Sequence, residues 1–269
     1  MCNVIYRCHE YAKTNDRILI IDTKTGWFND DINEYISFNS PYIYKGDPTI
    51  VYNTIKNLSI YPSGLDITAM ELPEKRKNIN ELGFSYYLNE HNLSYDLNKP
   101  FQERIMVYSM YKVGQRHFND MLRFCSLSYI VKQAYWSARS KMPAYYVGVH
   151  VRNTDYVSDV PDFIKTHEKQ FSEKAIFVAT DNKSSLELFK EKYGANVFSF
   201  TDITENGGKP LHEGNYRNKE ESRKYNIDTF VDILLLATSN EYYYSSKESG
   251  FSLAISELRS EEGLLKRLL

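Results

Sequence analysis

The chain has 269 residues, enough for two α/β lobes with a cleft between them or for one large domain. Hydrophobic residues make up 42% of it and charged residues 25%, a balance that excludes a mainly disordered chain. The 33 Lys and Arg nearly match the 35 Asp and Glu, and the formal net charge of −2 excludes general attraction to nucleic acid or anionic lipid. Any phosphate group must therefore be held by a local site.

Cysteine content and apolar runs bear on the cellular compartment. Cys2, Cys8 and Cys125 are odd in number and lack metal-ligand spacing, which is typical of a reducing compartment. No apolar run has the length of a membrane span, and the N-terminus carries no basic segment followed by an apolar stretch and a cleavage site. We therefore expect a cytoplasmic protein without a transmembrane segment.

The first half of the chain predicts few regular elements. Apolar residues at helical spacing predict a helix over residues 1–11, and the run Ile18–Ile21 predicts a short buried strand. Residues 27–99, rich in Asn, Tyr, Pro and Ser, are expected to form irregular loops with short elements. A long helix is predicted over residues 119–139. Its apolar stripe consists of Phe124, Leu127, Val131, Ala134, Tyr135 and Ala138.

In the second half, after an expected break at residues 141–144, strands and helices alternate. Short apolar runs predict strands at residues 145–151, 175–179, 197–200 and 241–245. Helices are predicted from the capping box of Ser184 and Glu187 to Tyr193, over residues 227–238, and after the Ser249-Gly250 turn. Such alternation favours a parallel sheet, and two Rossmann-like α/β lobes are the expected architecture.

Two polar residues, His150 and Arg152, close the strand predicted at residues 145–151. Because side chains alternate along a strand, both point to the same side of the sheet at its carboxyl end. Ligands bind at that end in open α/β sheets, and the arginine fork matches a phosphate with paired hydrogen bonds. This motif favours a nucleotide diphosphate. The alternative is a core histidine beside a surface ion pair of Arg152 and Asp155.

Asp181 and Asp232 are two further candidate carboxylates. Asp181 ends the run Phe177–Asp181 at the ligand edge, where capping the next helix is the role we favour over a ligand contact. Asp232 interrupts the apolar run Phe230–Leu236, where an unpaired carboxylate is costly. The N1–H and N2–H edge of guanine is a candidate partner for it. The alternative places Asp232 on the exposed face of its helix.

The turn Ser249-Gly-Phe-Ser252 follows a predicted strand and opens a predicted helix. Free backbone N–H groups and the positive end of the helix dipole at such a turn can hold a β-phosphate. Ser-Gly turns before helices are common, however, and most of them bind only water. This motif therefore supports a phosphate site only together with the others.

In order and spacing, four motifs of this half resemble the α-1,6-fucosyltransferase group, which includes nodulation and core-fucosylating enzymes. They are His150-Val-Arg152-Asn-Thr-Asp155, Ala179-Thr-Asp181, Asp232-Ile-Leu-Leu-Leu and Ser249-Gly-Phe-Ser252. Protein O-fucosyltransferases are more distant relatives that share the first His-x-Arg motif. The opening stretch from Tyr11 to Asp22 resembles the nodulation enzymes more weakly.

The resemblance implies a GT-B-like pair of lobes, the acceptor side at residues 1–142 and the nucleotide-sugar side at residues 143–269. It implies transfer of fucose from GDP-fucose to a glycan or polysaccharide acceptor, with inversion and without a metal ion or other cofactor. Arg152 then holds the β-phosphate, His150 and Asp232 hold the guanosine, and Ser249 holds the pyrophosphate. The full set of expected donor-binding residues is His150, Arg152, Asp181, Asp232, Ser249, Gly250, Phe251 and Ser252.

A base for the acceptor hydroxyl is offered by the loop after the first motif, which carries Asp155, Asp159 and Asp162. Asp159 falls closest to the acid of the fucosyltransferase group. The expected catalytic residues are thus Arg152, Asp159 and Asp155. The alternative is that these loop carboxylates are only solvated.

Two departures from the group keep other functions open. The usual Arg-Arg pair is Arg152-Asn153 here, which removes one positive charge and leaves the donor sugar open. The glycine-rich loop before the first helix is absent because Met1 begins inside that helix, so a truncated N-terminal lobe is expected. The alternatives are a transferase that uses another nucleotide sugar and a relic that binds a nucleotide sugar or glycan without turnover. Acceptor identity and oligomeric state stay open.

Overall fold

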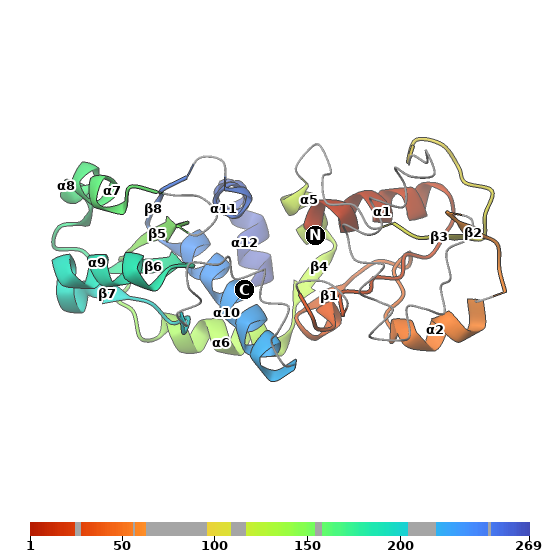
Figure 1. Cartoon of the computed structure of the whole chain (residues 1–269), viewed down its shortest axis with the longest axis horizontal. Helices are drawn as coiled ribbons and strands as arrows, with labels where there is room; N and C mark the ends of the chain where they lie inside the picture. The colour runs from red at the N-terminus through yellow and green to blue at the C-terminus, as the bar shows by residue number, and fades with distance from the viewer. Residues whose placement is uncertain are drawn as a thin grey trace. The chain divides into compact units, whose positions relative to one another are not determined.

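A computed structural model describes residues 1–24, 28–55, 57–62, 96–108, 117–153, 158–203, 219–246 and 249–269. The chain divides into two compact units, Met1–Ser126 and Leu127–Leu269. Figure 1 labels the helices and strands of both. The division lies ahead of residues 127–142, which we expected to close the first lobe. The helix in this stretch, α6 (Tyr129–Arg139), packs on helix α10 (Lys219–Thr238) and so belongs to the second unit.

The first unit opens with helix α1 (Cys2–Thr14), as the helical spacing predicts. Its inner face is formed by Ile5, Cys8, His9, Tyr11 and Ala12, all buried. The short helix α5 (Phe118–Arg123) packs against it, and the His9 ring stacks on Phe124 with ring centroids 4.2 Å apart. Apolar and aromatic contacts of one helix face thus hold the two helices together.

The expected strand at Ile18–Ile21 is wrong. Leu19 forms only an isolated parallel bridge with Ile43, in which the Leu19 N–H donates to the Tyr42 carbonyl at 2.7 Å. Ile18 is 58% exposed. A β-branched run forms a buried strand only where neighbouring segments pair with it and cover it. This run pairs only through the bridge of Leu19 with Ile43.

The rest of the first unit consists of short elements, as expected for the described part of residues 27–99. These are a 3-10 turn (Ile32–Glu34), strand β1 (Ile36–Phe38), helix α2 (Pro48–Ile55) and strand β2 (Ile60–Tyr61). β2 pairs in parallel with β3 (Ile105–Met106). Residues 63–95 lie outside the described part. A Rossmann-like lobe in this unit therefore stays a prediction.

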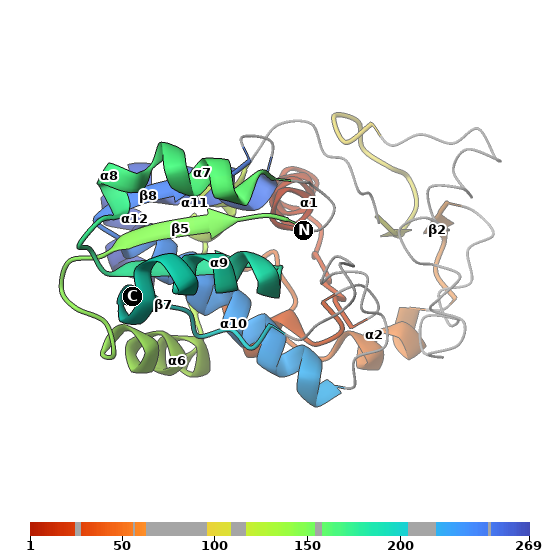
Figure 2. The ribbon, with the colours of Figure 1, turned by 60° about the vertical axis from the view of Figure 1, so that its left-hand side comes forward.

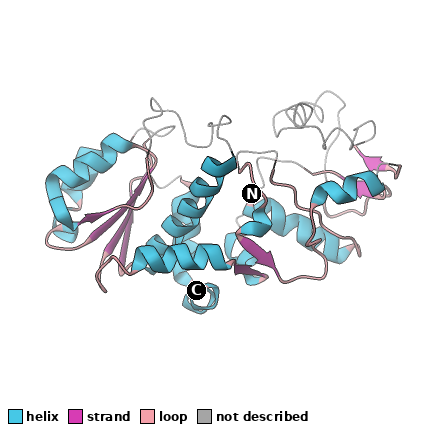
Figure 3. Cartoon of the chain, turned by 90° about the horizontal axis from the view of Figure 1, so that it is seen from below, coloured by secondary structure: helices cyan, strands magenta, loops and turns pink. Residues whose placement is uncertain are grey.

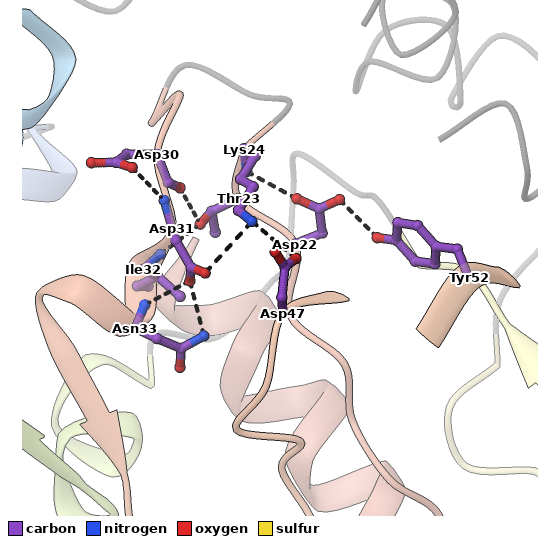
Figure 4. A network of polar contacts seen from close by, with 9 residues as sticks. All are labelled: Asp22, Thr23, Lys24, Asp30, Asp31, Ile32, Asn33, Asp47 and Tyr52. Atoms are coloured by element: carbon purple, nitrogen blue, oxygen red, sulfur yellow. Dashed lines mark hydrogen bonds and ion pairs between the residues drawn. The ribbon is translucent and has the colours of Figure 1, made fainter. Parts of the chain in front are cut away.

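Polar contacts rather than regular structure organise the loops of this unit (Figure 4). The Thr23 hydroxyl donates to the Asp30 carbonyl at 2.7 Å. The Lys24 ammonium lies 3.0 Å from a carboxylate oxygen of Asp47 and 3.8 Å from one of Asp31. Contacts of this kind carry no periodic apolar pattern, which is why the sequence predicts only loops here.

The long helix predicted over residues 119–139 is wrong as a single element. Helix α5 ends at Arg123, strand β4 (Cys125–Leu127) follows, and α6 begins at Tyr129. β4 pairs with β1, and next to the pair the Asn39 N–H donates to the Phe124 carbonyl at 2.7 Å. Pairing with a distant strand overrides the local helical spacing.

The second unit is built on a parallel sheet in the order β7-β6-β5-β8 (Figure 1), and Figure 2 gives a second view of β5. Its strands are β5 (Val147–Val151), β6 (Ile176–Thr180), β7 (Val197–Phe198) and β8 (Glu241–Tyr244). All four strands expected in this half are confirmed, with ends that shift by one or two residues. In the central register His150 pairs with Ala179 of β6 and with Tyr244 of β8.

Helices lie along both faces of this sheet (Figure 3). Val147, Val149 and Val151 turn to one face and join a core with helices α7 (Val160–Thr166) and α9 (Lys183–Tyr193). Full burial of each such valine stabilises the fold by about 1.5 kcal/mol or more. On the other face, Gly148 lies so close to α10 that a β-carbon on it would come within 2.6 Å of the Ser239 hydroxyl. By alternation, His150 belongs to this α10 face.

The helices of the second unit differ from the predicted ones in their caps and bounds. The capping box at Ser184 is wrong, because Asn182 caps α9 and accepts from the Ser185 N–H at 2.9 Å. α10 begins at Lys219, eight residues or so before the predicted start. Helix α11 (Gly250–Ser260) confirms the element after the Ser249-Gly250 turn. Helices α8 (Glu168–Phe171) and α12 (Glu262–Leu268) and a 3-10 turn (Gly194–Asn196) also belong to the described part of this unit.

Candidate functional site

Most of the expected site residues meet at one edge of the parallel sheet. His150 is the last residue but one of β5, Arg152 follows that strand, and Asp181 follows β6. Ser249 follows β8 and begins α11. Because the strands are parallel, their carboxyl ends lie side by side, and a ligand can contact several of them at once.

His150 is buried between the sheet and the start of α11. Its Nδ1 shares a 2.7 Å hydrogen bond with the Ser252 hydroxyl, and its ring packs on Phe251 with centroids 4.8 Å apart. Burial, with a smaller contribution from the charge of Arg152, lowers the pKa of His150 to about 3. The imidazole is therefore neutral at physiological pH and can act only as a hydrogen-bonding group. The expected core histidine and the expected donor contact are both compatible with this placement.

The N-terminus of α11 is capped and open at its first turn. The Ser249 hydroxyl accepts from the Ser252 N–H, and both serines are buried. Gly250 is exposed, and a β-carbon there would meet no atom within 4 Å. An open helix N-terminus of this kind favours an anion because its N–H groups and the helix dipole face the same way.

Two serine hydroxyls hold the backbone of Arg152. Its N–H donates to the Ser245 hydroxyl at 3.2 Å, and its carbonyl accepts from the Ser158 hydroxyl at 2.7 Å. The two hydroxyls lie 3.0 Å apart. The arginine side chain is partly buried at the strand edge. Asp155, its alternative ion-pair partner and an expected catalytic residue, lies outside the described residues.

Asn153 makes contacts that sequence reasoning missed. Its N–H donates to an Asp181 carboxylate oxygen at 2.9 Å, and its side-chain amide donates to the Ser185 hydroxyl at 3.0 Å. Its amide oxygen accepts from the Ser158 N–H at 3.1 Å. Asp181 thus ties two strand ends together, and the helix cap we favoured for it belongs to Asn182.

Asp232 is buried in α10, so the alternative of an exposed helix face is wrong. The pKa of this carboxyl is raised to about 8, mainly by burial, which outweighs the lowering effect of the 2.9 Å hydrogen bond from the Thr201 hydroxyl; the charge of Asp228 adds a smaller rise. Thr201 is a partner that the sequence did not suggest. Within the described part of the chain, no hydrogen bond links Asp232 to His150 or Ser249.

Asp159, the expected base, is the N-cap of α7. One of its carboxylate oxygens, Oδ1, accepts from the Asp162 N–H at 2.9 Å. Asp162 itself lies in the first turn of this helix, where a carboxylate complements the dipole. The cap engages Asp159 through that one oxygen only.

A metal-binding cluster and a membrane-spanning helix are both absent from the described residues. No group of three or more His, Cys, Asp or Glu side chains is arranged to bind a metal ion in this part of the chain. None of the helices described here is long and apolar enough to cross a membrane.

The fold defines a mixed α/β protein with a parallel sheet, and the candidate site lies at the carboxyl ends of its strands. No protein-family model matches the chain, and no curated protein sequence is significantly similar to it. Solved structures are similar to it in fold. The α-1,6-fucosyltransferase NodZ soaked with GDP-fucose matches over 98% of this chain and 87% of its own, with a TM-score of 0.62 and 14% identity.

Two further structures show the same likeness. Fucosyltransferase NodZ from Bradyrhizobium covers 96% of this chain and 88% of its own, with a TM-score of 0.63 and 13% identity. NodZ co-crystallised with GDP covers 96% and 87%, with a TM-score of 0.61 and 14% identity. At such identities the likeness establishes the fold. The resemblance to the α-1,6-fucosyltransferase group is confirmed at that level.

Proposed function

We propose that the chain is a glycosyltransferase that transfers fucose from GDP-fucose to a glycan or polysaccharide acceptor. One observation supports this proposal above the others: in a NodZ-type fold, a neutral His150, Arg152 and the open N-terminus of α11 meet at one sheet edge. We further propose that the two units are GT-B-like lobes, that transfer proceeds with inversion and without a metal ion, and that the protein is cytoplasmic.

The donor diphosphate would lie between Arg152 and the first turn of α11. A guanidinium binds phosphate oxygens in pairs, and the N–H groups near Gly250 offer further donors. Sugar transfer requires the departing diphosphate to gain negative charge as the glycosidic bond opens to an oxocarbenium-like state. A cation fixed at that oxygen stabilises the charge, which is the catalytic role we assign to Arg152.

The guanosine would be bound by His150 and Asp232. A neutral imidazole provides one hydrogen-bond donor and one acceptor, and its contact with the Ser252 hydroxyl leaves Nε2 for the nucleotide. Asp232 as a carboxylate would accept from the N1–H and N2–H of guanine. That contact requires the buried carboxyl to lose its proton, which links base recognition to pH.

For the acceptor, we assign Asp159 as the base that takes the proton from the attacking hydroxyl. The α7 cap uses Oδ1 of Asp159, and among the described residues none hydrogen-bonds to its second carboxylate oxygen, to which we assign the acceptor hydroxyl. A carboxylate can act in this way because proton transfer accompanies attack on the sugar. Asp155 remains the second candidate for this role.

Asn153 favours a second candidate function. With one arginine at the strand exit instead of two, the site offers less positive charge to a diphosphate. A transferase with a different nucleotide sugar, or a protein that binds a nucleotide sugar without turnover, would suit that reduced charge. Substrate tests separate these functions.

The test measures melting temperature with GDP-fucose, GDP-mannose and UDP-xylose, followed by donor hydrolysis with and without acceptor sugars. A ligand at about 100 times its Kd stabilises the fold by about 2.7 kcal/mol, a readily measured shift. We expect GDP-fucose to give the largest shift and Arg152→Ala to reduce it strongly. Arg123→Ala, which removes an exposed guanidinium of the first unit, is the matched control. Unchanged GDP affinity in Arg152→Ala would refute the phosphate assignment.

A further inference from the structure

Asn153 lies where three strand exits converge. Through its N–H it is tied to Asp181 after β6, and through its side chain to Ser185 of α9 and to Ser158 before α7. Ser158 also contacts Ser245 after β8. One residue thus links the loop after β5 to the segments after both neighbouring strands.

The side chain at this position must both donate and accept. The Asn153 amide nitrogen donates to the Ser185 hydroxyl, and its amide oxygen accepts from the Ser158 N–H. Arginine has donors only, and an ionised aspartate has acceptors only. An asparagine therefore satisfies both neighbours, whereas either charged residue leaves one of them without its partner.

Three hydrogen bonds of the same network fix the peptide groups on both sides of Arg152. Ser245 and Ser158 hold the N–H and the carbonyl of Arg152, and Asp181 holds the next N–H. With all three backbone groups anchored, the direction in which the arginine side chain leaves the strand is set by the network. If the backbone at Arg152 could rotate, the guanidinium, several bonds away, would be displaced from the phosphate.

We propose that Asn153 is a positioning residue for the donor diphosphate, acting through Arg152 and not by touching the nucleotide. The inference rests on the proposed function, in which Arg152 binds the β-phosphate. By sequence alone, Asn153 was interpreted only as the loss of the second positive charge of an Arg-Arg pair. The proposal gives the asparagine a function of its own. In this role a second arginine at position 153 weakens binding of the diphosphate.

The first experiment titrates GDP into the full chain by calorimetry for the wild type, Asn153→Ala and Asn153→Arg. We expect both variants to bind GDP about tenfold more weakly, because mis-set geometry at a charged contact carries penalties of this size. Asn196→Ala, an exposed asparagine before β7, is the matched control and keeps wild-type affinity. Tighter GDP binding by Asn153→Arg would overturn the proposal.

The second experiment combines Asn153→Ala with Arg152→Ala in a double-mutant cycle. If Asn153 acts through Arg152, its removal has no further effect on GDP affinity once the guanidinium is gone. Its effect on melting temperature persists in both backgrounds, which separates positioning from stability. Additive losses of affinity would overturn the proposal. Ser185→Ala removes one partner of Asn153 and is the milder variant, with a smaller loss in the same direction.

The cycle also separates the two proposals. If Arg152→Ala weakens GDP binding and Asn153→Ala does not, only the positioning role is wrong. If Arg152→Ala leaves GDP affinity unchanged, the phosphate contact and the positioning role both fail.

Discussion

GDP affinity should depend on pH through Asp232. Burial raises the pKa of this carboxyl to about 8, so most chains carry it protonated at pH 7. The guanine edge offers two donors and calls for the carboxylate form. Since only the ionised fraction is competent, apparent affinity falls with that fraction. At pH 7 about one chain in eleven is competent, and at pH 6 about one in a hundred.

The expected result is therefore a rise in affinity of roughly tenfold per pH unit below 8, levelling off above it. Asp228, whose pKa burial raises to about 6, becomes ionised over this range and adds its charge next to Asp232. Lys224 and Asp202, which form an ion pair, also act on Asp228. The charge of Lys224 lowers the pKa of Asp228, and the charge of Asp202 raises it. Binding also releases a proton from Asp232, which calorimetry in buffers of different ionisation enthalpy detects directly.

Guanosine is the better ligand for this titration. The terminal phosphate of GDP titrates near pH 6, as phosphate monoesters do, and would add its own pH dependence. Guanosine binding between pH 6.5 and 8.5 avoids that overlap. Asp232→Asn, which has no proton to lose, is the control and should show a flat profile. Flat binding in the wild type, or an equal slope in Asp232→Asn, would refute the reasoning.

Two further predictions concern Gly148 and Asp159. Gly148→Ala should destabilise the fold by about 1–3 kcal/mol because its new β-carbon would meet buried Ser239, whereas Gly250→Ala meets no neighbour and should keep the wild-type melting temperature. An unchanged melting temperature in Gly148→Ala would show that the helix shifts freely. Asp159→Asn should lower the rate of sugar transfer by about 100-fold or more while the α7 cap and GDP affinity are kept, because asparagine caps helices as aspartate does. Full transfer activity in this variant, measured with an acceptor sugar, would assign the base elsewhere.

Predictability differs between the two units. The strands β5, β6 and β8 could be predicted because each is a short apolar or aromatic run that a buried central strand requires. In the first unit the one such run, Ile18–Ile21, forms only an isolated bridge at Leu19 and no strand. Its loops are set by contacts such as Thr23 with Asp30 and Lys24 with Asp47, which join residues of no common period.

The candidate site was predictable only in part. His150 lies next to the first turn of α11 at the end of β5, and the Ser249-Gly250 turn was found where expected. The role of Asn153 was not predictable, because its partners Ser158, Ser185 and Asp181 come from three separate segments. Thr201 as the partner of Asp232 was missed for the same reason.

By itself the sequence determined the parallel strands of the second unit and the polar residues at their ends, because strand formation and side-chain alternation depend on neighbours along the chain. Tertiary structure decided where residues 119–139 break, since pairing of β4 with β1 outweighs helical spacing. It also decided the protonation of Asp232 and the anchoring of Arg152, because burial and long-range hydrogen bonds exist only once the chain has folded.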